Sequence, residues 1–273
     1  MRIAVLVKEV PDTSKPRVLN LETGLVQRHD SESNVELSLD EISERAVEAA
    51  LQLREQYSEA LNEEITIDAV TMAPEAALSS LRKALSLGAD EAVHIHDEAL
   101  LGADLTVTAE VLAAAIRKCG YDLVITGDAS TDGASSALPA MLAEHLGYFL
   151  LSRLASLTIQ ADREPDSLIL EASRTTTSAR QTLQAACPAV VSVTDAFPAP
   201  RFPNFKAIMA GKKKPVTTLS LNELGVNAED FSHPRAIMTA VQKAPPREAG
   251  SKIHDDGTGA EKIVEYLESK KLI

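Results

Sequence analysis

The fold is decided by the stretch Leu123-Val124-Ile125-Thr126-Gly127-Asp128-Ala129-Ser130-Thr131-Asp132-Gly133. Its first three residues form a short apolar run, which is typical of a strand buried on both faces. The small and polar residues that follow indicate a tight turn, and a helical pattern rich in Ala and Leu then continues to Leu146-Gly147. A strand, a turn and a helix in this order indicate an open α/β sheet, in which ligands bind at the carboxyl ends of the strands.

The chain before this stretch alternates between strand and helix patterns. Strands are predicted at residues 3–7, 65–70, 91–96 and 123–125, and helical spacing of apolar residues begins at Asp40, at Pro74 and near Leu105. Strict alternation of this kind predicts a doubly wound, mostly parallel sheet.

The alternation stops after Gly147. Three strand patterns without helices between them, at 154–159, 168–172 and 190–193, predict an antiparallel extension or a sheet edge. Residues 197–215 are rich in proline, which is incompatible with a helix or a central strand, so we expect a loop there. Residues 216–273 show little core-forming pattern before Ile263–Leu267. We therefore expect an α/β domain of residues 1–215 and a C-terminal arm, 216–273, that ends in a short helix and packs on a partner chain.

Composition narrows the class of protein. Apolar residues make up 45% of the 273 residues and charged residues 25%, as in soluble globular proteins. The net charge is −13 and the one basic tract is Lys212-Lys213-Lys214, which argues against a nucleic-acid partner. No apolar window is long enough to insert in a membrane, and the N-terminal apolar run is too short for a signal peptide. Cys119 and Cys187 form no CxxC pair, so we expect a reduced, cytoplasmic protein without a disulfide framework.

The turn from Gly127 to Gly133 is the strongest candidate for a binding site. Small residues let backbone N–H groups approach a phosphate, and a helix start adds positive potential. Ser135 and Ser136 can donate to phosphate oxygens or cap the helix. The sequence matches neither a P-loop nor GxGxxG, so an ordinary Gly/Asp/Ser turn with a capping serine remains the alternative.

Two further strand ends fall at the same edge of the predicted sheet. Lys8 follows the first strand, and Met72-Ala73-Pro74 follows the strand at 65–70, where small residues permit close approach of a flat ring. Taken singly, Lys8 fits an exposed turn and Met72 fits the core. Together with Gly127–Gly133 they indicate one ligand-binding edge.

Other residues suggest docking rather than chemistry. The proline-rich segment carries Arg201, Phe202, Phe205, Ile208 and Met209, residue types that favour interaction sites, although the two Phe side chains could instead pack the loop onto the sheet. His94 and His96 share a strand face with Asp97 nearby, but no third ligand is spaced to form a metal site. We find no catalytic triad or nucleophile elbow, and therefore predict neither catalytic residues nor a bound metal.

The order of these motifs resembles the β subunit of electron-transfer flavoproteins and their nitrogen-fixation-associated relatives. The resemblance covers residues 1 to about 215. The matching motifs are Val7-Lys8-Glu9-Val10-Pro11, Glu44-Arg45-Ala46-Val47-Glu48-Ala49-Ala50-Leu51, Val70-Thr71-Met72-Ala73-Pro74, Ala84-Leu85-Ser86-Leu87-Gly88-Ala89-Asp90, Thr126 to Gly133, Met141-Leu142-Ala143-Glu144-His145-Leu146-Gly147, Cys187-Pro188-Ala189-Val190-Val191-Ser192, Pro200-Arg201-Phe202-Pro203 and Lys212-Lys213-Lys214-Pro215.

The resemblance implies an adenine-nucleotide α-hydrolase-like Rossmann variant that holds AMP, or a second FAD if the protein bifurcates electrons. A redox FAD would sit mainly on an α subunit. The residues implied in nucleotide binding are Leu6, Val7, Lys8, Asp40, Ser43, Met72, Gly127, Ser130, Thr131, Asp132, Gly133, Ser135 and Ser136. The family's polar residues are replaced by Ala137 and Leu138, which leaves backbone N–H groups and Ser135/Ser136 for the phosphate.

The resemblance also implies docking and partners. Residues 197–215 would be the family's recognition loop, with Phe205 as the apolar anchor. The chain would be a non-catalytic electron carrier that accepts electrons from flavin dehydrogenases such as acyl-CoA dehydrogenases. The alternative is a stand-alone adenine-nucleotide-binding or stress-sensing module, which would have no use for an anchor loop and a long arm. A hydrolase acting at the α-phosphate would need a catalytic constellation near Gly127–Gly133, and none is evident.

Overall fold

The computed structural model describes residues 1–15, 17–28, 35–61, 64–160, 168–233, 235–247, 249–250 and 252–273, without the side chains of 58–61. These residues form two compact units, 1–239 and 240–273. The first unit contains the sheets and every candidate binding residue. The second contains one helix, α7 (Gly259–Ser269).

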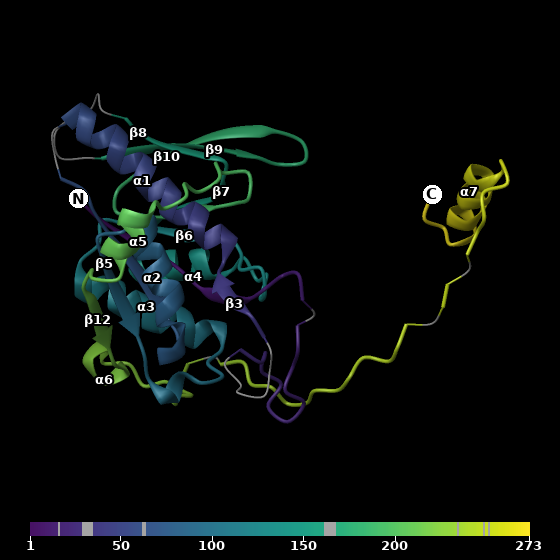
Figure 1. The fold of residues 1–273 in the computed structure, drawn as a ribbon, viewed down its shortest axis with the longest axis horizontal. Coiled ribbons are helices and arrows are strands. Elements are labelled where there is room, and N and C mark those ends of the chain that lie inside the picture. The colour runs from purple at the N-terminus through teal and green to yellow at the C-terminus, as the bar shows by residue number, and fades with distance from the viewer. Residues whose placement is uncertain are drawn as a thin grey trace. The chain divides into compact units, whose positions relative to one another are not determined.

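A sheet of seven parallel strands organises the first unit (Figure 1). Its strands, in spatial order, are β12 (Val216–Leu219), β5 (Glu91–Ile95), β4 (Thr66–Met72), β1 (Arg2–Leu6), β6 (Leu123–Gly127), β11 (Ala189–Val193) and β7 (Phe149–Leu154). The central strand β1 is buried on both faces, as its unbroken apolar sequence predicts. The doubly wound α/β fold is therefore confirmed.

Helices cover both faces of this sheet. Ile3 and Val5 of β1 face the core formed with α1 (Glu41–Leu61) and α2 (Leu78–Leu87). Ala4 and Leu6 face the opposite core, formed with α3 (Leu105–Cys119) and α4 (Leu138–Leu146). The short 3₁₀ turns η1 (Glu75–Ala77) and η2 (Glu98–Leu100) precede α2 and α3. Helices α2, α3 and α4 follow strands of the parallel sheet, and α1 follows β1 after the β2–β3 hairpin, so their N-termini gather at its carboxyl edge.

Local sequence sets the ends of these helices. The carboxylate of Asp104 caps α3 by accepting a hydrogen bond from the backbone N–H of Val107 at 2.8 Å. Gly120 and Gly147 end α3 and α4 in the left-handed conformation. Pro139 lies in the first turn of α4, where its missing N–H has no cost.

The antiparallel extension consists of β8 (Ser156–Gln160), β9 (Ile169–Thr175) and β10 (Arg180–Ala186). A separate hairpin pairs β2 (Glu9–Pro11) with β3 (Leu37–Leu39). The prediction for residues 190–193 was wrong, because this segment (β11) lies inside the parallel sheet between β6 and β7. All five residues of β11 are buried, and a continuous apolar run is typical of that interior position.

Two predicted boundaries need correction. Within the expected loop 197–215, residues Phe205–Gly211 form a helix, α5, because the Asn204 side chain caps it and no proline falls inside it. The expected arm, 216–273, starts too early. Val216–Leu219 (β12) joins the sheet beside β5 and is followed by the short helix α6 (Leu221–Leu224). Leu219 and Leu221 are buried. A strand of four residues is too short to show a recognisable apolar pattern in the sequence.

The short helix that the sequence predicts at the end of the arm is present as α7. Residues 234, 248 and 251 of the predicted arm lie outside the described residues. In the part of the chain that the structure describes, no helix combines the length and apolar character needed to cross a bilayer.

Candidate functional site

A cavity of about 510 Å³ opens at the carboxyl edge of the parallel sheet. Its walls come from the ends of β1, β4 and β6 and from the first turns of α1, α3 and α4. This volume lies within the range of small-molecule and cofactor sites. The topology therefore places a ligand-sized cavity where doubly wound folds bind their ligands.

Most of the residues predicted to bind a nucleotide line this cavity. They are Leu6, Val7, Lys8, Asp40, Ser43, Met72, Gly127, Ser130, Gly133 and Ser135. Thr131, Asp132 and Ser136 do not line it. Thr131 and Asp132 are held by polar contacts behind the wall, and the Ser136 hydroxyl donates to Asp128 Oδ2 at 3.3 Å.

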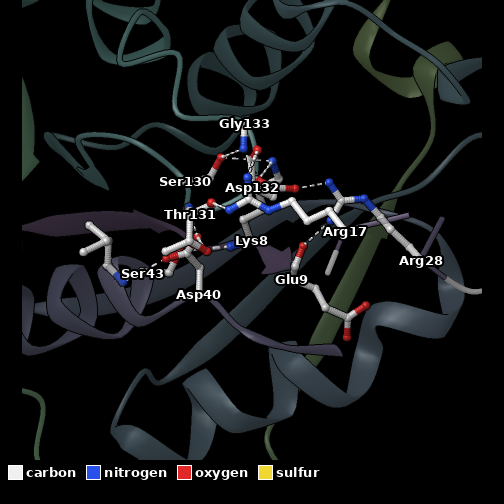
Figure 2. Close-up of polar contacts among 11 residues, drawn as sticks. Lys8, Glu9, Arg17, Arg28, Asp40, Ser43, Ser130, Thr131, Asp132 and Gly133 are labelled. Carbon is white, nitrogen blue, oxygen red and sulfur yellow. Dashed lines mark hydrogen bonds and ion pairs between the residues drawn. The ribbon is translucent and has the colours of Figure 1, made fainter. Parts of the chain in front are cut away.

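An ion cluster fixes the loop that follows β6 (Figure 2). The Asp132 side chain is only 2% exposed, and its Oδ1 accepts a hydrogen bond from Lys8 Nζ at 2.7 Å. The Arg28 guanidinium pairs with the other oxygen. Burial opposes ionisation of Asp132, but hydrogen bonds from Lys8 and Ser130 and the charge of Lys8 together hold its pKa well below the usual range. Asp132 is therefore an internal anion that anchors both cations of the cavity wall.

Asp40 connects the start of α1 to the same loop. Its buried carboxylate accepts hydrogen bonds from the Thr131 backbone N–H at 2.8 Å and from the Ile42 N–H at 2.9 Å. The backbone of Lys8 closes the arrangement, since its N–H donates to Ser43 Oγ at 3.2 Å and its carbonyl accepts from the Asp40 N–H. The end of β1, the start of α1 and the loop after β6 thus form one hydrogen-bonded unit.

Small residues in the loop are required by its geometry. A Cβ on Gly127 would lie 2.8 Å from Ile42 Cγ2, which is closer than side chains pack. Ala134 and Ser136 have φ angles of 49° and 52°, in the left-handed region that costs a non-glycine residue about 1 kcal/mol or more. Such local strain persists where surrounding contacts hold the backbone, and it occurs often at binding sites.

The sequence did not reveal several residues of the wall. The N-terminal turn of α3 contributes Asp104, Leu105 and Thr108, and the segment between β2 and β3 contributes Arg28. Asp104 could have been recognised from the sequence as a wall residue, because it precedes a helical pattern. An N-cap residue marks the helix end that faces the carboxyl edge of the sheet. Arg28 carried no signal, since it belongs to an irregular segment whose position depends on tertiary contacts.

The two histidines serve the structure. His94 is buried, its Nε2–H donates to the Ala73 carbonyl at 2.8 Å, and its ring stacks on that of His96 with centroids 5.6 Å apart. Across the described ranges, no three side chains of His, Cys, Asp or Glu gather as a metal site would require. Burial, followed by the charge of Asp122, raises the pKa of the Cys187 thiol to about 12. That thiol is therefore neutral near pH 7.

The predicted docking residues divide into two groups. Phe202 and Phe205 are 97% and 78% exposed, and Ile208 and Met209 are also exposed on or beside α5. Arg201 instead turns back to the body, where it pairs with Glu48 and Glu55 of α1. The structure thus gathers the apolar residues on one surface and uses Arg201 to hold that surface.

The fold and the site define an open-sheet α/β protein with a ligand-sized cavity at its carboxyl edge. The family model described as "Electron transfer flavoprotein domain" matches residues 31–224. Proteins named "Electron transfer flavoprotein subunit beta" from Mycobacterium bovis and Mycobacterium leprae are each 40% identical to this chain over 99% of both chains. The Bacillus subtilis protein of the same name is 29% identical over 99% of this chain and 98% of its own length.

The chain belongs to the electron transfer flavoprotein β-subunit family. The resemblance found in its motifs is therefore confirmed, and it extends over the whole chain rather than ending near residue 215. Members of this family are electron-carrier subunits rather than catalysts, which agrees with a site built from structural ion pairs and caps.

Replacement of Asp132 by Asn should destabilise the protein by about 2–3 kcal/mol at pH 7, because Lys8 and Arg28 lose the carboxylate that pairs them. Since the folded-state pKa of Asp132 is depressed, this stabilisation is present above the unfolded pKa of about 4 and is lost as pH falls further. Urea unfolding of wild type and variant at pH 7 measures the difference, and repeating it from pH 4 down to pH 2 follows its loss. Asp195→Asn, at an exposed carboxylate, is the control. Equal stability of D132N and wild type at pH 7 would contradict this role.

Proposed function

We propose that this chain, as the β subunit of a heterodimeric electron transfer flavoprotein, holds AMP in the cavity at the carboxyl edge. The proposal also assigns the redox FAD mainly to the α subunit and names flavin dehydrogenases, such as acyl-CoA dehydrogenases, as electron donors. The observation that carries it is the cavity itself, which joins an apolar wall to a small-residue loop with the cations Lys8 and Arg28 beside it.

A mononucleotide fits the two sides of this cavity. Met72, Ala73 and Leu105 supply an apolar wall against which a flat base can pack. Lys8 and the Ser135 hydroxyl line the cavity and supply donors suited to a phosphate. The volume of about 510 Å³ suits a ligand of this size.

The charges of the wall favour one phosphate over several. Lys8 and Arg28 are its cations, and Asp132 already neutralises part of their charge. The carboxylates of Glu9, Asp40, Asp104 and Asp128 also line the cavity. Each added phosphate charge would meet this excess of negative charge, so AMP is a better occupant than ADP or ATP.

The flavin would carry the electrons, and this chain would hold the nucleotide and orient the docking surface. FAD supplies one- and two-electron chemistry when bound, and the protein sets its environment. The roles left to this chain are rigid placement of the nucleotide and presentation of a docking surface. We propose that the exposed residues of α5, with Phe205 as the anchor, meet the dehydrogenase.

We propose further that the second unit packs on the α subunit. Ile253, Ile263, Val264 and Tyr266 are each about half exposed there. An apolar surface of this kind on a short helical segment is typical of a protein interface. A stand-alone nucleotide-binding module would leave it uncovered.

Nucleotide analysis tests the proposal. The chain is co-expressed with its α subunit, the complex is purified, and the nucleotides released by denaturation are identified by chromatography and absorbance. The expected result is one FAD and one AMP per heterodimer. Two FAD and no AMP per heterodimer would mean that a second flavin occupies the site proposed for AMP in this chain. Failure to form a flavin-containing heterodimer would contradict the proposed function and favour the stand-alone module.

Replacement of Phe205 by Asp should lower the rate of electron transfer from the dehydrogenase at least a hundredfold, because a charge cannot enter an apolar pocket without a partner. The FAD content should stay the same, since Phe205 is 78% exposed and is not among the residues that line the cavity. Phe205→Leu is the matched control, because it keeps an apolar anchor. Unchanged transfer kinetics in F205D would remove Phe205 from the anchor role.

A further inference from the structure

Residues 17–28 form a small hairpin beside the cavity, which we call the edge hairpin. Leu19 and Val26 pair as an isolated antiparallel bridge. The backbone N–H of Asn20 donates to the carbonyl opposite it at 2.9 Å, and the Asn20 side chain accepts from the Glu22 N–H in the turn at 2.8 Å. These bonds lie inside the hairpin, so they shape it without fastening it to the sheet.

Two arginines, one at each end, fasten the edge hairpin to the loop after β6 (Figure 2). Arg17 donates to the carbonyls of Thr131 and Asp132, the second at 3.2 Å. Arg28 pairs with the Asp132 carboxylate at the other end. Between the two arginines, residues 18–27 form no hydrogen bond or ion pair with the rest of the described chain. The polar attachment of the hairpin therefore rests on Arg17 and Arg28, and we call their contacts with the loop the latch.

Apolar contacts with two glycines complete the attachment. Leu25 packs over Gly102, where an added Cβ would lie 3.7 Å from Leu25 Cδ2. Met238 packs on Gly24, where an added Cβ would lie only 2.8 Å from Met238 Cγ. Apolar contact is not directional, so such surfaces can separate and meet again without a fixed bonding geometry.

The edge hairpin also forms one wall of a second cavity, of about 580 Å³. Gly24, Leu25 and Val26 line it on the hairpin side, and His96 and Leu101 line it on the side of the sheet and η2. The two cavities adjoin, because five residues line both of them: Arg28, Met72, Ala73, Pro74 and Ala103. Displacement of the hairpin would therefore connect the first cavity to solvent through the second.

The two ends of the latch differ in how easily they open. The Asp132 side chain is 2% exposed, so release of Arg28 would leave a buried carboxylate with one cation fewer. Arg17 is exposed and donates only to backbone carbonyls. Water can replace these bonds once they part, which lowers the cost of breaking them. The hairpin therefore opens at lower cost from its Arg17 end.

We propose that the edge hairpin is a lid on the nucleotide cavity and that the latch sets how fast the nucleotide enters and leaves. The inference rests on the proposed function and adds the regulation of the same site. The latch joins protein groups only, so it favours the closed lid whether or not a nucleotide is bound. Loosening it accelerates entry and release alike and leaves the affinity unchanged. Arg17 lines neither cavity, so it is a positioning residue.

Exchange of labelled AMP tests the latch. Nucleotide-stripped heterodimer is mixed with radiolabelled AMP to measure the association rate, and the loaded complex is chased with excess unlabelled AMP to measure release. Arg17→Gln should raise both rates about tenfold, since hydrogen bonds from a charged donor contribute about that factor to an equilibrium. The Kd for AMP should stay the same.

Lys15→Gln is the matched control. It removes a neighbouring exposed cation that pairs with Glu36 rather than with the loop after β6. Both rates should therefore equal those of wild type. Arg28→Gln should raise both rates and also weaken binding, because Arg28 belongs to the latch and lines the cavity.

The association rate separates a lid from the other roles that Arg17 could have. A residue that only contacts the nucleotide, or only stabilises its site, changes release without accelerating association. Faster release in R17Q without faster association would therefore overturn the proposal, and so would rates equal to those of wild type.

Arg17→Lys gives the same test in a variant that keeps the charge. Lysine lacks the planar fork that reaches two neighbouring carbonyls, so both rates should rise by a smaller factor than in R17Q. A rise in release alone would count against the lid here too. Absence of AMP binding to the wild-type heterodimer would instead contradict the proposed function, and the lid with it.

Discussion

The ion pair between Lys8 and Asp132 is the interaction on which the site depends. It joins the end of the central strand β1 to the loop after β6, two segments 124 residues apart in sequence. A buried carboxylate without a cation would be costly, and a lysine without a partner would leave the loop untethered. With both present, the backbone strain at Ala134 and Ser136 is held in place. The charge pair therefore helps to fix one wall of the cavity, together with the contacts of Asp40 and Arg28.

Helix α1 connects the cavity and the docking surface. Its start contributes Asp40 and Ser43 to the nucleotide site, and Glu48 and Glu55 further along hold Arg201. One rigid helix thus sets the position of both surfaces relative to the sheet. This arrangement suits an electron carrier, whose task is to hold a cofactor environment and a docking surface at a fixed geometry rather than to move protons.

Much of the fold followed from local pattern, and the rest depended on contacts that no pattern shows. The apolar run Leu123–Ile125 and the small residues after it located the site edge, because parallel strands bring their carboxyl ends together. Arg28 was missed, since an irregular segment reaches the cavity only through tertiary contacts. Arg201 was predicted to dock, but its two partners on α1 are identifiable only once α1 and the loop are placed side by side.

The central claim, that this chain holds a nucleotide phosphate at the Lys8 edge of its cavity, is tested most directly by titrating AMP into nucleotide-stripped heterodimer in a calorimeter. The account predicts one AMP site per heterodimer, with affinity weakened about tenfold or more by Lys8→Gln, because a charge-assisted hydrogen bond to phosphate is lost. Absence of AMP binding, or binding that K8Q leaves unchanged, would contradict it.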